Sequence, residues 1–310
     1  MLSPRLPTSR RRTASRSAIL AAGLALVVGP PVLVAQSMGE MPGMHRAAGP
    51  VSATARREID SVRQAAARYH ESAAAAAAGF HPVFGWIPTM GVHWIDRQRM
   101  NKDAQLVRTA PSQLMFSKIA GRDSLVGAAY GYFVPVADST RPILFDGNPP
   151  WHEHPDLAPP GETLVMLHVW FVPSPDGPFA GTNPNLPFWA LGLAAPDSAR
   201  MHDAAFSSRV RRASLALAEI ADTTAIFGNL ESRPDVHAML AVHRDSIRAI
   251  LPELSAADGA KDAARWNRAT ERLADQWDAI YDGYLASART ASGKERMERF
   301  IAMLLGKHGE

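Results

Sequence analysis

The architecture of this chain is best read from one run of residues, Thr163-Leu164-Val165-Met166-Leu167-His168-Val169-Trp170-Phe171-Val172. Apolar side chains occupy both alternating sets of positions in this run. That pattern indicates a strand whose two faces are both buried in the protein. We therefore expect a β core around this strand, with the histidine His168 inside it.

Further strands are expected upstream of that run. Residues 113–119 and 125–134 contain aromatic and β-branched residues, and the segment Gly121-Arg122-Asp123 between them favours a hairpin. Glycine and proline are frequent from about Phe80 to Trp189. Strand-like segments separated by frequent glycine and proline predict a compact, mainly antiparallel β core.

Helices are expected on both sides of this core. Thr54 to Ala78 is rich in alanine and predicts one helix that ends at Gly79. From Asp197 onward the apolar residues recur at helical spacing, and Ser292 with Glu295 has the capping-box spacing of a last helix. The fold class is therefore α+β, with an N-terminal Ala-rich helix and a C-terminal helical bundle or helical layer.

The N-terminus has the pattern of a secretory signal peptide. Basic residues such as Arg10 and Arg16 precede an apolar core, and Val32-Leu33-Val34-Ala35 offers a cleavage site. The apolar run is short for a membrane span, so we expect a periplasmic or secreted protein without a transmembrane anchor after cleavage. The expected parts are a signal peptide (1–35), a flexible Met/Gly/Pro linker (36–51), a helix plus β core (52–190) and a helical region (191–310).

Composition excludes several classes of function. The chain has no cysteine, which excludes disulfides, thiol catalysis and thiolate metal sites. It has 33 basic and 30 acidic residues, and residues 1–35 contribute five arginines and no acid. Without them the balance is 28 against 30, so no basic surface for a nucleic-acid partner is expected.

Four histidines are concentrated in the predicted β core, in the contexts Gly91-Val92-His93-Trp94, Trp151-His152-Glu153-His154 and Leu167-His168-Val169-Trp170. His152 and His154 are two residues apart, so in an extended segment both rings project from one face. Three converging histidines with an open position suit one Zn, Cu or Fe ion. The hypothesis is a metal site made by His93 and His168, joined by His152 or His154.

Other residues are candidates to surround or support these ligands. Glu153 and Asp156 are the nearby acidic residues, and the pocket candidates are Trp94, Trp170 and Met166. No Gly-x-Ser-x-Gly elbow, phosphate loop, dinucleotide fingerprint or His-Glu-x-x-His motif is present, so the sequence indicates no reaction.

Two alternatives to the metal site stay open. The histidines can line a metal-free polar or ligand pocket, or they can be purely structural. The corresponding function is a non-catalytic module that binds a small molecule or a protein partner, with homo-oligomers formed through the C-terminal helices.

Histidines and methionines outside the core have weaker patterns. Met38, Met41, Met44 and His45 can capture Cu(I), although an incidental spacer is the favoured interpretation. His237 and His243 fit a helical core or interface, and His70 and His81 flank the end of the first helix.

Several segments also share a pattern with known sequences. They are Tyr69, Ala78-Gly79-Phe80, Met90-Gly91-Val92-His93-Trp94, Leu125-Val126-Gly127 with Tyr130, Leu167-His168-Val169-Trp170, Pro175-Asp176-Gly177-Pro178-Phe179 and Asn183-Pro184. As a set they resemble a family of exported bacterial proteins of unassigned function, with a Met-Gly-x-His-aromatic segment and a Leu-His-x-Trp strand before an Asn-Pro loop.

The resemblance covers about residues 65–187 and leaves out the helical tail. It implies that His93 and His168 are the characteristic histidines. The family usually has an acidic residue just before the tyrosine of its Val-Gly-x-x-Tyr segment, where this chain has Ala129. A carboxylate ligand at that place is therefore absent here, and no activity follows from the resemblance.

Overall fold

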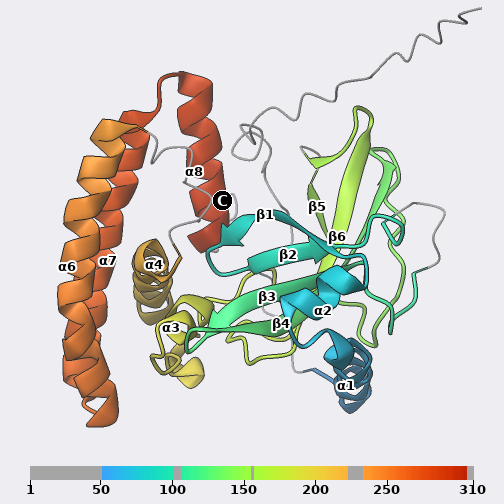
Figure 1. Ribbon diagram of the computed structural model, residues 1–310, viewed down its shortest axis with the longest axis horizontal. Helices are drawn as coiled ribbons and strands as arrows, with labels where there is room; N and C mark the ends of the chain where they lie inside the picture. The colour runs from blue at the N-terminus through green and yellow to red at the C-terminus, as the bar shows by residue number, and fades with distance from the viewer. Residues whose placement is uncertain (1–50, 101–105, 155–156, 223–232, 306–310) are drawn as a thin grey trace, which may run out of the picture. The chain divides into compact units, whose positions relative to one another are not determined.

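A six-stranded antiparallel sheet forms the centre of the computed structural model, which describes residues 51–100, 106–154, 157–222 and 233–305. The order of strands across the sheet is β1-β2-β3-β4-β6-β5 (Figure 1). The strands are β1 His81–Ile87, β2 Gly91–Ile95, β3 Gln113–Ile119, β4 Arg122–Pro135, β5 His152–His154 and β6 Glu162–Trp170.

The strand predicted to be buried on both faces is β6. Every residue of it after Glu162 is buried, and it pairs with β4 on one side and β5 on the other. The prediction is confirmed for residues 163–170, and His168 lies inside the sheet as expected. The strand ends at Trp170, so the last two residues of the predicted run, Phe171 and Val172, lie beyond it and are half-buried.

The predicted hairpin joins β3 to β4. Its two turn residues, Ala120 and Gly121, have positive φ angles of 48° and 77°. Two consecutive left-handed residues match the right-handed twist of the flanking strands. The turn is one step earlier than predicted, because Arg122 and Asp123 already pair with Ile119 and Lys118.

The Ala-rich N-terminal segment is not one continuous helix, which corrects the predicted span. It consists of α1 Ala53–Ala66, the 3-10 helix η2 Ala67–Tyr69 and α2 Ser72–Ala77, and it ends at Gly79 (φ 92°) as predicted. Tyr69 and Ala75 pack in one cluster with Phe80. Residues six apart lie on different faces of an unbroken helix, so the interruption allows both to be buried.

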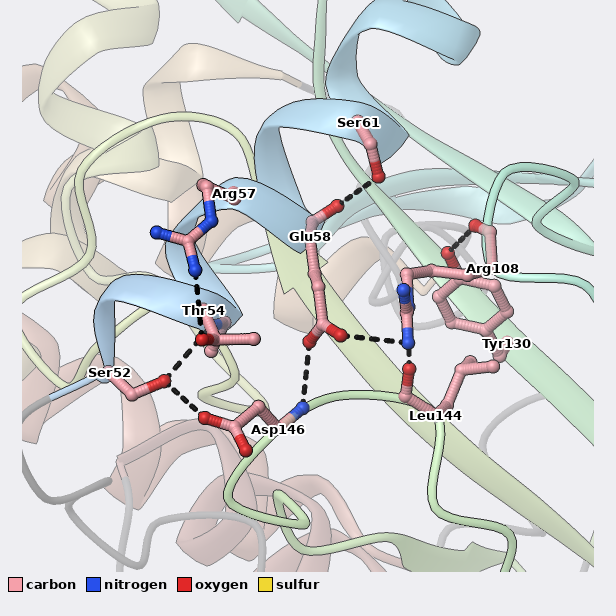
Figure 2. A network of polar contacts seen from close by, with 10 residues as sticks. Ser52, Thr54, Arg57, Glu58, Ser61, Arg108, Tyr130, Leu144 and Asp146 are labelled. Carbon is pink, nitrogen blue, oxygen red and sulfur yellow. Dashed lines mark hydrogen bonds and ion pairs between the residues drawn. The ribbon is translucent and has the colours of Figure 1, made fainter.

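Helix α1 packs on the sheet through Ile59 and Val62, which share a cluster with Tyr130. A network of hydrogen bonds also joins α1 to neighbouring segments at this contact (Figure 2). Glu58 on α1 accepts hydrogen bonds from Arg108 (2.9 Å) and from the backbone N–H of Asp146 (2.7 Å). The Arg108 side chain also donates to the carbonyl of Leu144 at 2.7 Å, and the Tyr130 hydroxyl donates to the carbonyl of Arg108.

We expect Glu58→Ala to lower the free energy of unfolding by about 2 kcal/mol, because it removes both bonds and leaves a partly buried arginine without its carboxylate. The control is Asp60→Ala on the same helix. The Asp60 carboxylate is mostly exposed and lies 3.6 Å from Arg63, so a change within about 0.5 kcal/mol is expected. Urea unfolding measures both, and equal effects would contradict this account of the network.

The C-terminal region is helical, as predicted. Its long helices pack around one apolar cluster that includes Leu217, Leu240, Trp277 and Ile301. No described helix is long and apolar enough to cross a membrane. The elements are α3 Leu186–Ala190, η4 Ser198–Arg200, α4 Ala204–Ala221, α6 Pro234–Gly259, α7 Ala263–Ser287 and α8 Ala291–Leu305 (Figure 1).

The start of α8 differs from the prediction. The helix begins at Ala291, and the Thr290 hydroxyl accepts a hydrogen bond from the N–H of Gly293 at 3.0 Å. Thr290 therefore caps this end, and the Ser292–Glu295 spacing is coincidental because both residues are already inside the helix.

The helices also support the sheet. Ile87 and Met90, from the β1–β2 hairpin, belong to the same apolar cluster as the C-terminal helices. One end of the sheet is therefore held by helical packing. The predicted signal peptide (1–35) and nearly all of the linker (36–51), including its methionines and His45, lie outside the described residues.

Candidate functional site

The four core histidines project from the same face of the sheet. His168 pairs with Ala129, His152 with Met166 and His154 with Leu164. Side chains two apart on a strand share a face, and directly paired residues do too. Positions 164, 166 and 168 of β6 therefore share their face with both histidines of β5.

His93 belongs to this group although two strands separate its own strand from that of His168. It lies on β2, and β3 and β4 separate it from His168 on β6. Across a flat sheet three strand spacings amount to about 14 Å. The Nε2 atoms of His93 and His168 nevertheless lie 3.3 Å apart, so the sheet must be curled with the histidines on its concave side.

Small residues on the concave face of β4 permit this curl. A methyl group on Gly127 would lie 2.4 Å from Cε of Met115 and 2.7 Å from the carbonyl oxygen of Val169. A methyl group on Gly131 would lie 2.6 Å from the Gln113 amide nitrogen. Larger residues at these positions would fill the space over which the histidines meet.

The histidines form one buried cluster. Their exposed fractions lie between 2% and 5%. Ring centroids are 5.3 Å apart for His93 and His168, 4.9 Å for His152 and His168, and 5.0 Å for His152 and His154. The structure thus brings together all four histidines singled out in the sequence.

Hydrogen bonding fixes the tautomer of His168. Its Nδ1 lies 2.9 Å from the carbonyl oxygen of Gly181, which can only accept, so Nδ1 carries the proton. The lone pair of a neutral His168 is then on Nε2 and faces His93. Nδ1 of His93 and both ring nitrogens of His154 have no hydrogen-bond partner among the described residues.

Burial favours the neutral form of three of these imidazoles, those of His93, His154 and His168. It lowers the pKa of His154 to about 3 and that of His168 to about 4. The bond to Gly181 opposes part of the shift of the His168 pKa. The pKa of His93 is also held well below its usual value, by burial first and then by His168 and His154.

A cavity of about 160 Å³ opens beside the cluster. No Asp, Glu, Lys or Arg is among the described residues that line it. The lining combines three imidazoles, one amide and apolar side chains: Val83, Phe84, Ile87, Met90, His93, Ile95, Met100, Gln113, Phe133, His154, Leu157, Leu164, Met166 and His168.

The supporting residues proposed from the sequence lie in different places. Met166 lines the cavity, and Trp170, on the same face as His168, donates from Nε1 to the carbonyl of Ala180 at 2.6 Å. Glu153 projects from the opposite face of β5 and forms an ion pair with Arg141. Trp94 likewise lies on the face opposite His93, where its ring packs against Phe116.

The remaining candidates that the structure describes do not contribute to the cluster. Asp156 lies outside the described residues. His70 is exposed beside Glu71, and His81 is not among the residues that line the cavity. In the helical region, Nδ1 of His243 contacts Gln276 at 2.9 Å, and His237 is exposed.

Sequence reasoning missed Gly181, Gln113, Met90 and Met100. Gly181 acts through its carbonyl, which no sequence pattern marks. The nearest signal is the Asn-Pro loop, because the backbone N–H of Asn183 donates to the carbonyl of Thr89 at 2.7 Å. This bond ties the loop next to the segment that leads into His93.

The described side chains do not form a finished metal site. No three of their His, Asp or Glu groups are placed to hold a metal ion as they stand. Ala129 is directly opposite His168, and its methyl side chain supplies no ligand.

The chain was also compared with known proteins. No protein-family model, no curated protein and no solved structure matches it.

Proposed function

We propose that this protein is exported and that it binds one transition metal ion through the buried histidines, with His93 and His168 as the first two ligands. The observation that carries the proposal is the 3.3 Å separation of their Nε2 atoms. With metal–nitrogen bonds of about 2.0–2.1 Å, two ligands of a tetrahedral site lie about 3.3–3.4 Å apart. The two nitrogens therefore already have the spacing of one edge of such a site.

The surroundings of His168 support the same proposal. Histidines that bind metals commonly donate their other N–H to a carbonyl or carboxylate, which orients the ring. The Nδ1–H of His168 donates in this way to Gly181. Burial keeps the pKa of both rings low, and the neutral imidazole is the form that binds metal.

The third ligand in this proposal is His154. It lines the same cavity as His93 and His168, and neither of its ring nitrogens has a hydrogen-bond partner among the described residues. A buried polar group without a partner costs about 1–3 kcal/mol, and a metal bond would remove this cost. Imidazole ligands suit Zn, Cu and Fe, and we propose one of these without assigning a reaction.

A second candidate is a metal-free ligand pocket. It is favoured by the finding that no three described residues are positioned together as metal ligands. In that state the Nε2–H of His93 donates to Nε2 of His168. We also propose that the chain belongs to the family of exported bacterial proteins that its sequence resembles.

Metal binding separates the two candidates. Protein purified without a histidine tag is expected to bind about one equivalent of Zn²⁺ or Cu²⁺ tightly enough to survive dialysis. His93→Gln and His168→Gln should each weaken binding at least about 100-fold, because each removes a ligand. Isothermal titration and metal analysis of the dialysed protein measure this.

The control is His70→Gln, which changes an exposed histidine and should bind like the unchanged protein. Circular dichroism checks that the core variants remain folded. A protein that binds no Zn²⁺, Cu²⁺ or Fe²⁺ would overturn the proposal in favour of the metal-free pocket, as would full binding by folded His93→Gln.

A further inference from the structure

The cavity beside the histidines has a size and a lining that a metal ion alone does not explain. Its volume is about 160 Å³, and most of its wall is apolar, with Val83, Phe133, Leu157 and Leu164 among the wall residues. A dry cavity of about 150 Å³ accommodates one benzene molecule. The space therefore fits one six-membered ring and little more.

The wall also selects against charge. None of the described lining residues is Asp, Glu, Lys or Arg, and most of the wall is apolar. An ionised ligand would lose its hydration and gain no opposite charge, which is costly in an apolar site. The favoured occupant is therefore neutral.

The cavity wall also includes polar residues. His154 lines the cavity and has two ring nitrogens without a hydrogen-bond partner among the described residues, and His93 has a third at Nδ1. Gln113 also lines the cavity, and its side-chain amide nitrogen makes a weak contact with the sulfur of Met100 at 4.0 Å. A hydroxyl on the occupant could donate to an imidazole and accept from this amide.

The rim of the cavity carries a strained aromatic residue. Phe84 has a φ of 62° and is 36% exposed although it is a large apolar side chain. It lies within the irregular part of β1, where the pairing with β2 shifts between Val83 and Ile87. Positive φ at a bulky residue costs about 1–3 kcal/mol, and such strain is concentrated at ligand clamps and functional sites.

From these observations we infer that the cavity binds a compact neutral molecule with one six-membered ring and one hydroxyl, of the phenol class. The ring occupies the apolar wall between Val83, Phe133 and Leu164, and the hydroxyl points to the imidazoles. Phe84 lies over the entrance. This inference goes beyond metal binding and applies to the metal-free protein as well.

The test measures binding of phenol, benzene and benzoate to metal-free protein at neutral pH, by calorimetry or ligand-observed NMR. Phenol is expected to bind at least about tenfold more tightly than benzoate, because a desolvated, unpaired carboxylate costs more than 1.4 kcal/mol. Benzene should bind more weakly than phenol because it lacks the hydroxyl. No detectable phenol binding, or benzoate binding that equals it, would overturn the inference.

Two variants localise the binding. Val83→Phe adds volume at the partly exposed wall and should reduce phenol affinity at least about tenfold. The matched control, Val136→Phe, makes the same change at a residue that is 61% exposed and should bind phenol normally. Phe133→Ala enlarges the cavity and should admit 2-naphthol, which the unchanged protein rejects.

Normal phenol binding by folded Val83→Phe would place the ligand elsewhere and contradict the inference. The metal proposal has a separate outcome. Protein that binds Zn²⁺ but not phenol leaves the metal site standing and removes the phenol pocket. Protein that binds phenol but no metal does the reverse.

Discussion

The metal-free protein is expected to lose stability steeply between pH 6.5 and pH 4. An unfolded histidine titrates near pH 6.5, whereas burial holds the pKa of His154 at about 3 and that of His168 at about 4 in the folded chain. Between these values the unfolded state binds more protons, so stability falls as the pH falls. Each histidine contributes a slope of up to about 1.4 kcal/mol per pH unit. Well above pH 6.5 these two histidines are neutral in both states and contribute no slope.

The bond from His168 to Gly181 opposes only part of this effect. No described carboxylate lines the cavity to oppose it further, and Glu153 lies on the opposite face of β5 with Arg141. The loss at pH 4.5 therefore amounts to several kcal/mol for the buried histidines together, which is a large part of a typical folding free energy.

Urea unfolding at pH 7, 6, 5 and 4.5 measures this dependence. Carboxylates elsewhere also titrate, so the informative quantity is the difference between variants. His154→Gln should flatten the slope by one histidine's share, while His70→Gln, at an exposed site, should leave it unchanged. A slope that His154→Gln does not alter would show that this ring is protonated in the folded protein.

The second large effect is expected from Gly91→Ala. Gly91 begins β2, two residues before His93, and has a φ of 76°. A methyl group there would lie 2.3 Å from the carbonyl oxygen of Phe116 and 3.1 Å from its carbonyl carbon. Both atoms belong to the backbone of the neighbouring strand and cannot rotate away. We expect a loss of about 3–5 kcal/mol from backbone strain together with this clash.

Gly121→Ala is a matched control for this effect. Gly121 has nearly the same φ, 77°, but no atom lies within 4 Å of the added methyl group. Its expected cost is the conformational penalty alone, about 1–2 kcal/mol. Thermal or urea unfolding compares the two variants, and equal losses would show that the contact with Phe116 does not constrain β2.

Local sequence patterns determined the elements of this fold. Strand β6 was predictable because its apolar residues fill both alternations, and the C-terminal helices because theirs recur at helical spacing. These signals arise from interactions between near neighbours in the chain. The predicted continuous helix over 54–78 was wrong where a distant contact mattered, since Tyr69 and Ala75 are buried in one cluster with Leu114 and Phe116 of β3.

The sequence also identified the histidines, and strand periodicity placed His152 and His154 on one face. Their meeting with His93 is a property of the tertiary structure alone. It depends on the curl of the sheet across β3 and β4, which the small residues Gly127 and Gly131 permit. The hydrogen bond between His168 and the carbonyl of Gly181, and the cavity beside the histidines, also depend on the tertiary structure. Their groups are far apart in the chain, and only the packed sheet brings them within contact distance.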